Sequence, residues 1–325
     1  MKIALINGGL ANQTFQYIFM RYLEESTGQR VFVDDSFFFL TSKEMGGFPL
    51  STHNGYEIER VFPNAKKPML LSEHFPPDVW QYMIVKARAS KNYLCGIAEQ
   101  LLENGIDLEM IIECEVNDGV VAEAFRYTGR KRTTPRSFFN SGVSGVQGAA
   151  FYYGYWINPA WFNAYKEILL SELSFAPIAD TRNKEYEREI RESYAIGIHI
   201  RRGDFVKLGW AVPERQYADT IAKLKLEVAK TPNVKYFVFS DDIDWCKNNA
   251  QGLGLAFDIT TFVEGNFDYQ NNYVDMQLMT MCNALVLGVS SFSYLASLLN
   301  QEPNFIALMG RYDGLSTQDI AKKPQ

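Results

Sequence analysis

Cysteine and histidine are scarce in this sequence, and long apolar runs are missing. The 325 residues contain four cysteines and three histidines. The cysteines (Cys95, Cys114, Cys246 and Cys282) lack the short spacing of metal ligands, so no dedicated metal site is expected. No run of residues is long enough to cross a bilayer, and there is no repeat of fixed period or low-complexity tract.

Charge and the first residues narrow the class of protein further. A net charge of −6 at pH 7 argues against a general nucleic-acid binder. The start, MKIALINGGLANQ, has one lysine and no small-residue cleavage site, so it is interpreted as a first strand rather than a signal peptide. Without an export signal, reduced and buried thiols are expected, and the prediction is a cytoplasmic protein.

The first half begins with one strand–helix–strand unit. KIALI is followed by a Gly-rich turn, a helix with apolar residues at helical spacing that Gly28 ends, and the strand RVFVDD. The aromatic residues 37–93 give no clear pattern. YLCGIAE and FYYGYW are further strand candidates, and residues 159–173 predict one helix with proline in its first turn.

The second half alternates regularly. The charged residues 180–193 predict a solvated helix between domains. The strands YAIGIHI, KYFVFS, ALVLGV and NFIALM then alternate with four helical segments. Such alternation predicts parallel sheets covered on both faces. We therefore expect an α/β protein with two doubly wound domains, residues 1–178 and 179–325, facing a cleft.

The stretch AIGIHIRRGDF places polar residues at the end of an apolar strand. Ligands of open α/β sheets bind at the carboxyl ends of the strands, and guanidinium groups there suit a phosphate-bearing ligand. Strand alternation puts His199 and Arg201 on one side and Arg202 on the other. Asp204 is then placed to hold one guanidinium. The alternative is an Arg–Asp pair that only stabilises the strand end.

Two further strand ends carry polar residues. Asp241 and Asp242 follow the second strand and suit hydroxyls or base N–H groups. Ser290 and Ser291 open a helix, which makes either an anion site or a plain N-cap. Asp275, on the preceding helix, is either a first-turn acid or an acceptor for N1–H and the 2-amino group of guanine. Three strand ends converging on one polar ligand favour the ligand-binding interpretation.

Several segments together resemble the bacterial α-1,2-fucosyltransferases of glycosyltransferase family 11. They are GGLANQTFQY, HIRRGDF, FVFSDDIDW, DMQLMTMCNALVLGVSSFSYLASLLN and FYYGYWINPAWF, and their order and spacing match from Met1 to about Asn300. The resemblance implies a GT-B-like fold, with an acceptor-side N-terminal and a GDP-fucose-binding C-terminal Rossmann-like domain. It implies inverting transfer of fucose from GDP-fucose to the 2-hydroxyl of a galactose-type residue on a glycan, a galactoside 2-alpha-L-fucosyltransferase activity. No essential metal or other cofactor is expected.

The resemblance also implies roles for single residues. By it, Arg201 binds the pyrophosphate and Asp275 binds guanine, while Ser290 and Ser291 hold the β-phosphate and Asn12 faces the donor. The implied catalytic set is Arg201, Asp204 and Asn12. The implied donor-binding set is His199, Arg201, Arg202, Asp241, Asp275, Ser290, Ser291 and Phe292. Departures from the family pattern are Ala11, Thr14, Tyr294-Leu295 and the poorly matching residues 88–148.

Fucosyl transfer develops negative charge on the departing GDP, which arginine and a helix N-terminus can neutralise without a metal. No general base stands out. Asp34 and Asp35 at a strand end, and His53 in a loop, are candidate base or acceptor contacts. Asp242 and Asp244 superficially resemble a metal-binding pair, but first-turn acids at a helix start explain them better.

Other functions stay open at this point. They are a non-catalytic nucleotide- or glycan-binding module, and a metal-dependent glycosyltransferase that uses Asp242 and Asp244. Residues 126–136 carry five basic side chains, either as a solvated loop or as a basic face for a lipid-pyrophosphate-linked glycan. The expected partners are GDP-fucose and a galactose-terminated glycan, with no nucleic acid. The basic-face alternative adds a lipid-linked acceptor and peripheral contact with the inner membrane face.

Overall fold

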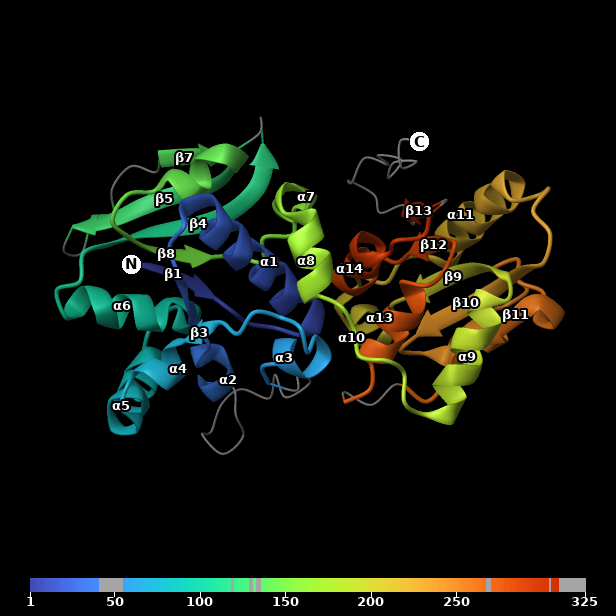
Figure 1. Cartoon of the computed structure of the whole chain (residues 1–325), viewed down its shortest axis with the longest axis horizontal. Coiled ribbons are helices and arrows are strands. Elements are labelled where there is room, and N and C mark those ends of the chain that lie inside the picture. Colours follow the sequence, from blue (N-terminus) through green and yellow to red (C-terminus); the bar gives the residue numbers. More distant parts are fainter. Residues whose placement is uncertain are drawn as a thin grey trace. The chain divides into compact units, whose positions relative to one another are not determined.

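The chain forms two compact units, Met1–Ser174 and Phe175–Gln325 (Figure 1). The computed structural model describes residues 1–40, 55–117, 120–128, 131–132, 136–266, 270–303 and 305–309. The predicted boundary at 178/179 lies in the segment that joins the last helix of the first unit to the first helix of the second. Within the described ranges, no helix combines the length and apolar character needed to span a membrane.

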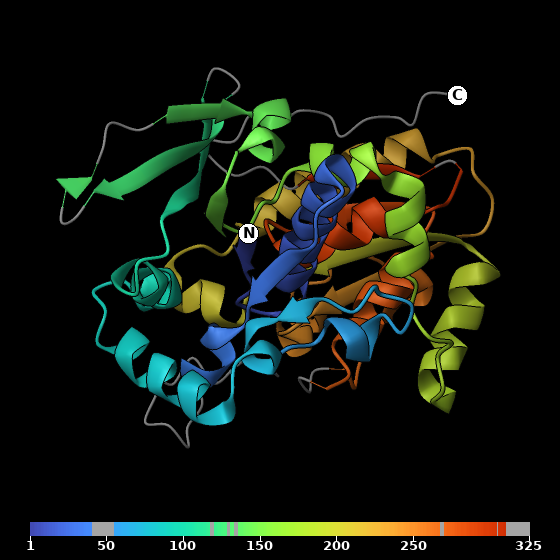
Figure 2. The same cartoon turned by 60° about the vertical axis from the view of Figure 1, so that its left-hand side comes forward.

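The sheet of the first unit has a parallel and an antiparallel part. Its strands are β1 (Lys2–Leu5), β2 (Val31–Asp34), β3 (Met69–Leu70), β4 (Leu108–Asn117), β5 (Val120–Thr128), β6 (Lys131–Arg132), β7 (Arg136–Phe139) and β8 (Ala149–Tyr153). The order is β3-β2-β1-β8-β4-β5-β6, with β7 also paired to β5. Strands β3 to β4 in this order are parallel, whereas β5, β6 and β7 add in antiparallel fashion. Figure 2 shows this extension, in green, projecting beyond the parallel strands.

Helices cover both faces of the parallel part. They are α1 (Leu10–Thr27), α2 (Ser36–Leu40), α3 (Ile58–Val61), α4 (Leu71–His74), α5 (Pro77–Arg88), α6 (Gly96–Glu103), α7 (Pro159–Ala164) and α8 (Lys166–Glu172), with short 3-10 turns at Tyr93–Cys95 and Asn140–Gly145. Helices α5 and α6 bury an apolar cluster that includes Ile84, Ile97 and Met110. On α1, Phe19 stacks on Trp156 with ring centroids 3.9 Å apart.

The sequence predicted part of this unit. The first β-α-β unit is confirmed, although α1 begins at Leu10 after the N-cap Gly9, inside the expected turn. The first three residues of FYYGYW, Phe151–Tyr153, form the end of β8, so a strand is confirmed there. The strand predicted for YLCGIAE is wrong: these residues form a 3-10 turn and the start of α6, because a short apolar run fits a buried helix as well as a strand. Residues 159–173 form two helices rather than one, broken at Tyr165.

The second unit has a five-stranded parallel sheet in the order β11-β10-β9-β12-β13. The strands are β9 (Tyr194–Ile200), β10 (Val234–Ser240), β11 (Thr260–Phe262), β12 (Ala284–Leu287) and β13 (Ile306–Met309). Chain order runs outward from β9 in one direction and then reverses to β12. This is the strand order of a Rossmann-like sheet, and its switch point lies between β9 and β12.

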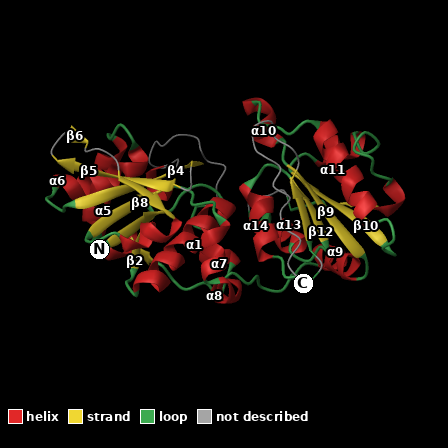
Figure 3. Ribbon diagram, turned by 90° about the horizontal axis from the view of Figure 1, so that it is seen from above, coloured by secondary structure: helices red, strands yellow, loops and turns green. Residues whose placement is uncertain are grey.

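Helices flank this sheet on both sides, as Figure 3 shows for α11 on one side and α13 and α14 on the other. The helices are α9 (Thr181–Arg191), α10 (Gly203–Leu208), α11 (Glu214–Glu227), α12 (Ile243–Asn248), α13 (Tyr273–Met279) and α14 (Ser291–Leu299), with a 3-10 turn at Phe257–Ile259. Ile196, Ile198 and Ile200 pack with Ile221 and Leu224 of α11. The predicted doubly wound arrangement and the mostly solvated helix α9 are confirmed. Helix α10 was not predicted; it buries none of its residues and so shows no apolar period.

Candidate functional site

The sequence-predicted polar residues of the second unit gather at its switch point. Strand β9 lies between β10 and β12, and the carboxyl ends of all three strands therefore meet at one edge. The residues that follow them are 201–204 after β9, 241–242 after β10 and 288–291 after β12. Ligands of open α/β sheets bind at this position.

Arg201 is held by two carboxylates. Its Nη2 donates to Oδ1 of Asp204 over 2.6 Å, and its Nη1 lies 2.8 Å from Oδ2 of Asp241. The other Asp241 oxygen accepts from the backbone N–H of Arg202 over 2.8 Å. The predicted contact between Asp204 and a guanidinium is therefore confirmed. About a third of the Arg201 side chain stays exposed, so the guanidinium is oriented and still accessible to a ligand.

Arg202 is fastened to α12. Its Nε donates to Oδ2 of Asp242 over 3.1 Å, and its guanidinium lies 3.7 Å from the centroid of the Trp245 ring. Oδ1 of Asp242 caps α12 by accepting from the Trp245 N–H, and Asp244 lies in the first turn, as predicted. Strand β9 ends at Ile200, so strand alternation does not extend to Arg201 and Arg202. Arg201 pairs with Asp241 and Arg202 with Asp242, and their expected separation on two sides stays a prediction.

His199 is buried at the end of β9. Burial and then the charge of Arg201 lower its pKa to about 3, so the imidazole is neutral near pH 7. Its ring centroid lies 5.7 Å from that of Phe292 on α14, and its Nδ1 has no partner within the described ranges. Gly288 is pressed against it: a Cβ there would lie 2.9 Å from the His199 carbonyl oxygen. His199 therefore packs the edge of the site without adding charge.

The N-terminus of α14 adds an electropositive end at the same edge. Ser290 is the N-cap, and its Oγ accepts from the Phe292 N–H over 3.3 Å, as the capping alternative predicted. Ser291 and Phe292 are half-buried, and no acid occupies the first turn. Unpaired backbone N–H groups and the helix dipole favour an anion here.

Asp275 is half-buried and belongs to a chain of polar groups whose middle members, Asn183 and Asn266, are buried. Nδ2 of Asn266 donates to Oδ1 of Asp275 over 2.7 Å and to Oδ1 of Asn183 over 2.8 Å. Asn183 donates back to Asn266 and to Oδ2 of Asp180, the N-cap of α9, over 2.9 Å each. Burial raises the pKa of Asp275 to about 7, although Asn266 and the charge of Arg182 oppose the rise. The carboxylate is thus held in one orientation and is half-ionised near neutral pH.

The remaining predicted residues lie in the first unit. Asn12 is half-buried in the first turn of α1. Asp34 is fully buried; Oδ1 accepts from Ser36 N–H over 3.0 Å, Oδ2 lacks a partner within the described ranges, and burial raises its pKa to about 7. Asp35 accepts from the backbone N–H and the hydroxyl of Ser72, which ties β2 to α4. Their roles toward an acceptor stay predictions.

Two sequence predictions concern residues or side chains that the structure does not describe. His53 lies outside the described residues, and so do the side chains of the basic segment 126–136. Among the residues that are described, no group of three or more His, Cys, Asp or Glu is placed to hold a metal.

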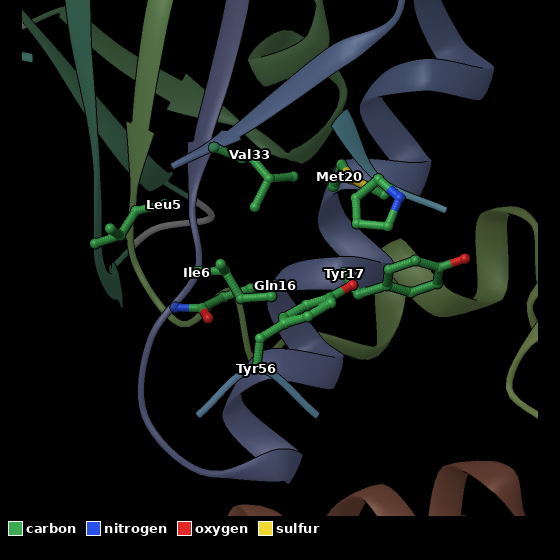
Figure 4. Close-up of a pocket in the computed structure, with 9 residues that line it drawn as sticks. Leu5, Ile6, Gln16, Tyr17, Met20, Val33 and Tyr56 are labelled. Atoms are coloured by element: carbon green, nitrogen blue, oxygen red, sulfur yellow. The ribbon is translucent and has the colours of Figure 1, made fainter. Parts of the chain in front are cut away.

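One small cavity lies between β1, β2 and α1 of the first unit (Figure 4). The cavity has room for about one water molecule. Its lining includes Gln16, Tyr17 and Tyr56, and the Tyr56 hydroxyl is buried without a partner among described residues. The cavity is far too small for a sugar or nucleotide.

Comparison with known proteins identifies the family. The model of glycosyl transferase family 11 matches residues 133–313, more than half of the chain. The chain belongs to this family. It is 28% identical over 303 residues to an alpha-1,2-colitosyltransferase of Escherichia coli, an alignment that covers 90% of this chain and 85% of that protein.

A solved structure has the same type of fold. NodZ alpha-1,6-fucosyltransferase, soaked with GDP-fucose, matches with a TM-score of 0.51 at 13% identity over 94% of each chain. The family 11 chain thus has the GT-B type of fold, with two Rossmann-like units, as expected. The predicted cleft concerns the placement of the units and stays a prediction.

Sequence reasoning missed several residues of this site. Trp245, which stacks under Arg202, was visible only as an apolar residue of α12. Asn183 and Asn266 are 83 positions apart, and no local pattern marks them as partners. Such contacts depend on how α9 and the loop before α13 meet in space.

Proposed function

We propose that this family 11 glycosyltransferase transfers fucose from GDP-fucose to the 2-hydroxyl of a galactose-type residue, with inversion at the anomeric carbon. One observation carries the proposal. The accessible guanidinium of Arg201, oriented by Asp204 and Asp241, lies at the same sheet edge as the acid-free N-terminus of α14. This combination of a guanidinium and a helix N-terminus supports a diphosphate site.

The chemistry of the leaving group fits these residues. As the anomeric C–O bond breaks, negative charge grows on the β-phosphate of GDP. In this proposal Arg201 and the uncapped backbone N–H groups at the N-terminus of α14 stabilise that charge, each charge-assisted hydrogen bond contributing about 1.5–3 kcal/mol. Arg202 is engaged by Asp242 and Trp245 and is expected to contribute less. Within this proposal no metal ion is required.

In this proposal, Asp275 recognises the guanine base of the donor. A carboxylate accepts from both N1–H and the 2-amino group of guanine, whereas adenine presents an acceptor at the matching position. The hydrogen bond from Asn266 leaves the carboxylate capacity for further donors. Selection of guanine therefore depends on an ionised and correctly oriented Asp275.

A second candidate is transfer of colitose, an analogue of fucose. It rests on the similarity of this chain to an alpha-1,2-colitosyltransferase over 90% of its length. The test is a matched set of assays with GDP-fucose and GDP-colitose against galactose-terminated oligosaccharides. Turnover with GDP-fucose supports the first proposal, turnover with GDP-colitose alone supports the second, and GDP binding without turnover supports a binding module.

The acceptor panel should contain free and lipid-pyrophosphate-linked forms of the same glycan. The basic residues of segment 126–136 motivate this comparison. A lower KM for the lipid-linked form, together with co-sedimentation with anionic vesicles, supports a peripheral protein at the inner membrane face. Equal KM values and no co-sedimentation support a cytoplasmic enzyme with a soluble acceptor.

A further inference from the structure

The first unit has a switch point of its own. Its parallel strands run β3-β2-β1-β8-β4, and chain order reverses between β1 and β8. The groups at this edge are the turn before α1, residues 154–157 after β8, and Glu113 near the end of the parallel pairing of β4. Ligands of open α/β sheets bind at this position, and none of the roles described above uses Glu113.

Glu113 lies against the turn that follows β8. Its Oε2 accepts from the backbone N–H of Tyr155 over 2.6 Å and of Trp156 over 2.8 Å, and the N–H of Ile157 also contributes. Burial raises the pKa of this carboxyl group, and the three N–H groups oppose the rise. Gly154 is required beside it, because a Cβ there would lie 2.4 Å from the Cβ of Glu113.

The same turn is fixed from its other side. Trp156 has φ +57°, a left-handed conformation that costs a bulky residue of order 1–3 kcal/mol. Its ring is buried and stacks on Phe19 of α1. Because Trp156 is held in the core, its neighbours Tyr155 and Ile157 project outward and are 45% and 39% exposed. A strained turn thus displays an aromatic ring beside an anchored carboxylate.

These groups suit a neutral sugar rather than a nucleotide. A carboxylate has about four acceptor positions, and three backbone N–H groups leave room for a sugar hydroxyl. Glu113 is half-buried rather than enclosed, so such a hydroxyl can reach it. The electron-rich face of an exposed ring attracts the C–H groups on one side of a sugar. The negative charge of Glu113 repels the diphosphate of a donor.

We propose that Glu113 and Tyr155 form a subsite in the first unit that binds the acceptor glycan, Glu113 through a sugar hydroxyl and Tyr155 through its ring. The inference rests on the proposed function, because it assigns the acceptor of that reaction. It does not depend on how the two units are placed.

Two variants test the subsite. Glu113→Gln keeps a carbonyl oxygen for the backbone N–H groups of the turn but replaces the other carboxylate oxygen with an amide donor. Tyr155→Ala removes an exposed ring, and Tyr82→Ala on α5, whose residue is 59% exposed, is the matched control. The KM for a galactose-terminated oligosaccharide should rise about tenfold in the first two variants and stay unchanged in the control. GDP affinity should be the same in all three.

The readouts separate this inference from the proposed function. Binding of the oligosaccharide is measured by calorimetry without donor, beside the transfer assay and thermal unfolding. If the wild type binds the glycan and the first two variants lose it, the subsite stands even where GDP-fucose is not turned over. An unchanged acceptor KM and affinity in folded Glu113→Gln and Tyr155→Ala overturn the subsite while the proposed function stands. An equal loss of GDP affinity also overturns it, since that marks a general structural effect.

Discussion

Replacing Asp275 with asparagine should stabilise the ligand-free protein at alkaline pH and weaken its binding to GDP. The carboxyl group is packed against Asn266, and burial raises its pKa from 3.8 to about 7. Above pH 7 the fold therefore contains an ionised carboxylate with little solvation. Asparagine keeps an oxygen to accept from Asn266 and carries no charge, so it removes this cost.

The size and sign of this change in stability follow from the linkage between proton binding and folding. A folded-state pKa above the unfolded value means that the contribution to stability is full below the unfolded pKa and is lost as pH rises through about 7. A rise of roughly three units corresponds to about 4 kcal/mol, at 1.36 kcal/mol per unit. With local relaxation, we expect Asp275→Asn to gain about 2–4 kcal/mol at pH 8.5 and almost nothing at pH 4. For a unit of this size that is roughly 4–16 °C in Tm.

The assay compares thermal unfolding at pH 4 to 8.5 with GDP titration at pH 8. Asp34→Asn is the matched control, because burial also raises the pKa of Asp34 to about 7, but in the first unit. Both variants should flatten the fall in stability at alkaline pH. Only Asp275→Asn should lose GDP affinity, by about 100-fold, or about 2.7 kcal/mol. A Tm difference that does not vary with pH refutes the burial argument, and unchanged GDP affinity refutes the guanine role.

Three further outcomes are expected. Arg201→Ala should lower kcat by about 10² to 10³, the loss seen when one oxyanion donor is removed, whereas Arg202→Ala should cost less; near-normal turnover by folded Arg201→Ala excludes it from the mechanism. Asn266→Ala should shift the pH dependence of GDP affinity upward, because loss of its hydrogen bond raises the pKa of Asp275, and an unshifted profile counts against the contact. Activity should survive excess EDTA, and complete loss with full recovery on adding Mg²⁺ or Mn²⁺ contradicts the arginine-based proposal.

The second unit was predictable from sequence because its information is local. Strands β9, β10, β12 and β13 are short apolar runs that alternate with helical segments, and this alternation predicted a parallel sheet. Strand β11 (Thr260–Phe262) was not predicted, because three residues with two threonines show no apolar run. The first unit is different. Its sheet gains β5, β6 and β7 by antiparallel pairing, and its short helices α2 to α4 have too few residues to show a period.

The contacts of the candidate site also divide into those between residues close in sequence and those between residues far apart in sequence. The Arg201–Asp204 pair spans three residues, and this closeness in sequence predicted that Asp204 holds one of the two guanidinium groups. The contacts of Arg201 with Asp241 and of Asn183 with Asn266 join residues 40 or more positions apart, and they exist only because β10 lies beside β9 and α9 reaches the loop before α13. Strand alternation does not determine the direction of Arg202, because β9 ends two residues before it.

The two switch points differ in their positively charged groups. At the edge of the second unit, Asp204, Asp241 and Asp242 are paired with Arg201 and Arg202, and the N-terminus of α14 carries no acid. These arginines and this helix N-terminus can meet a diphosphate. At the edge of the first unit, Glu113 accepts from backbone N–H groups, while Asp34 ends the neighbouring strand β2 and Asp35 follows it. If Glu113 binds a sugar hydroxyl as proposed, exchange of Glu113 for lysine should weaken glycan binding without creating a GDP site as tight as that at Arg201.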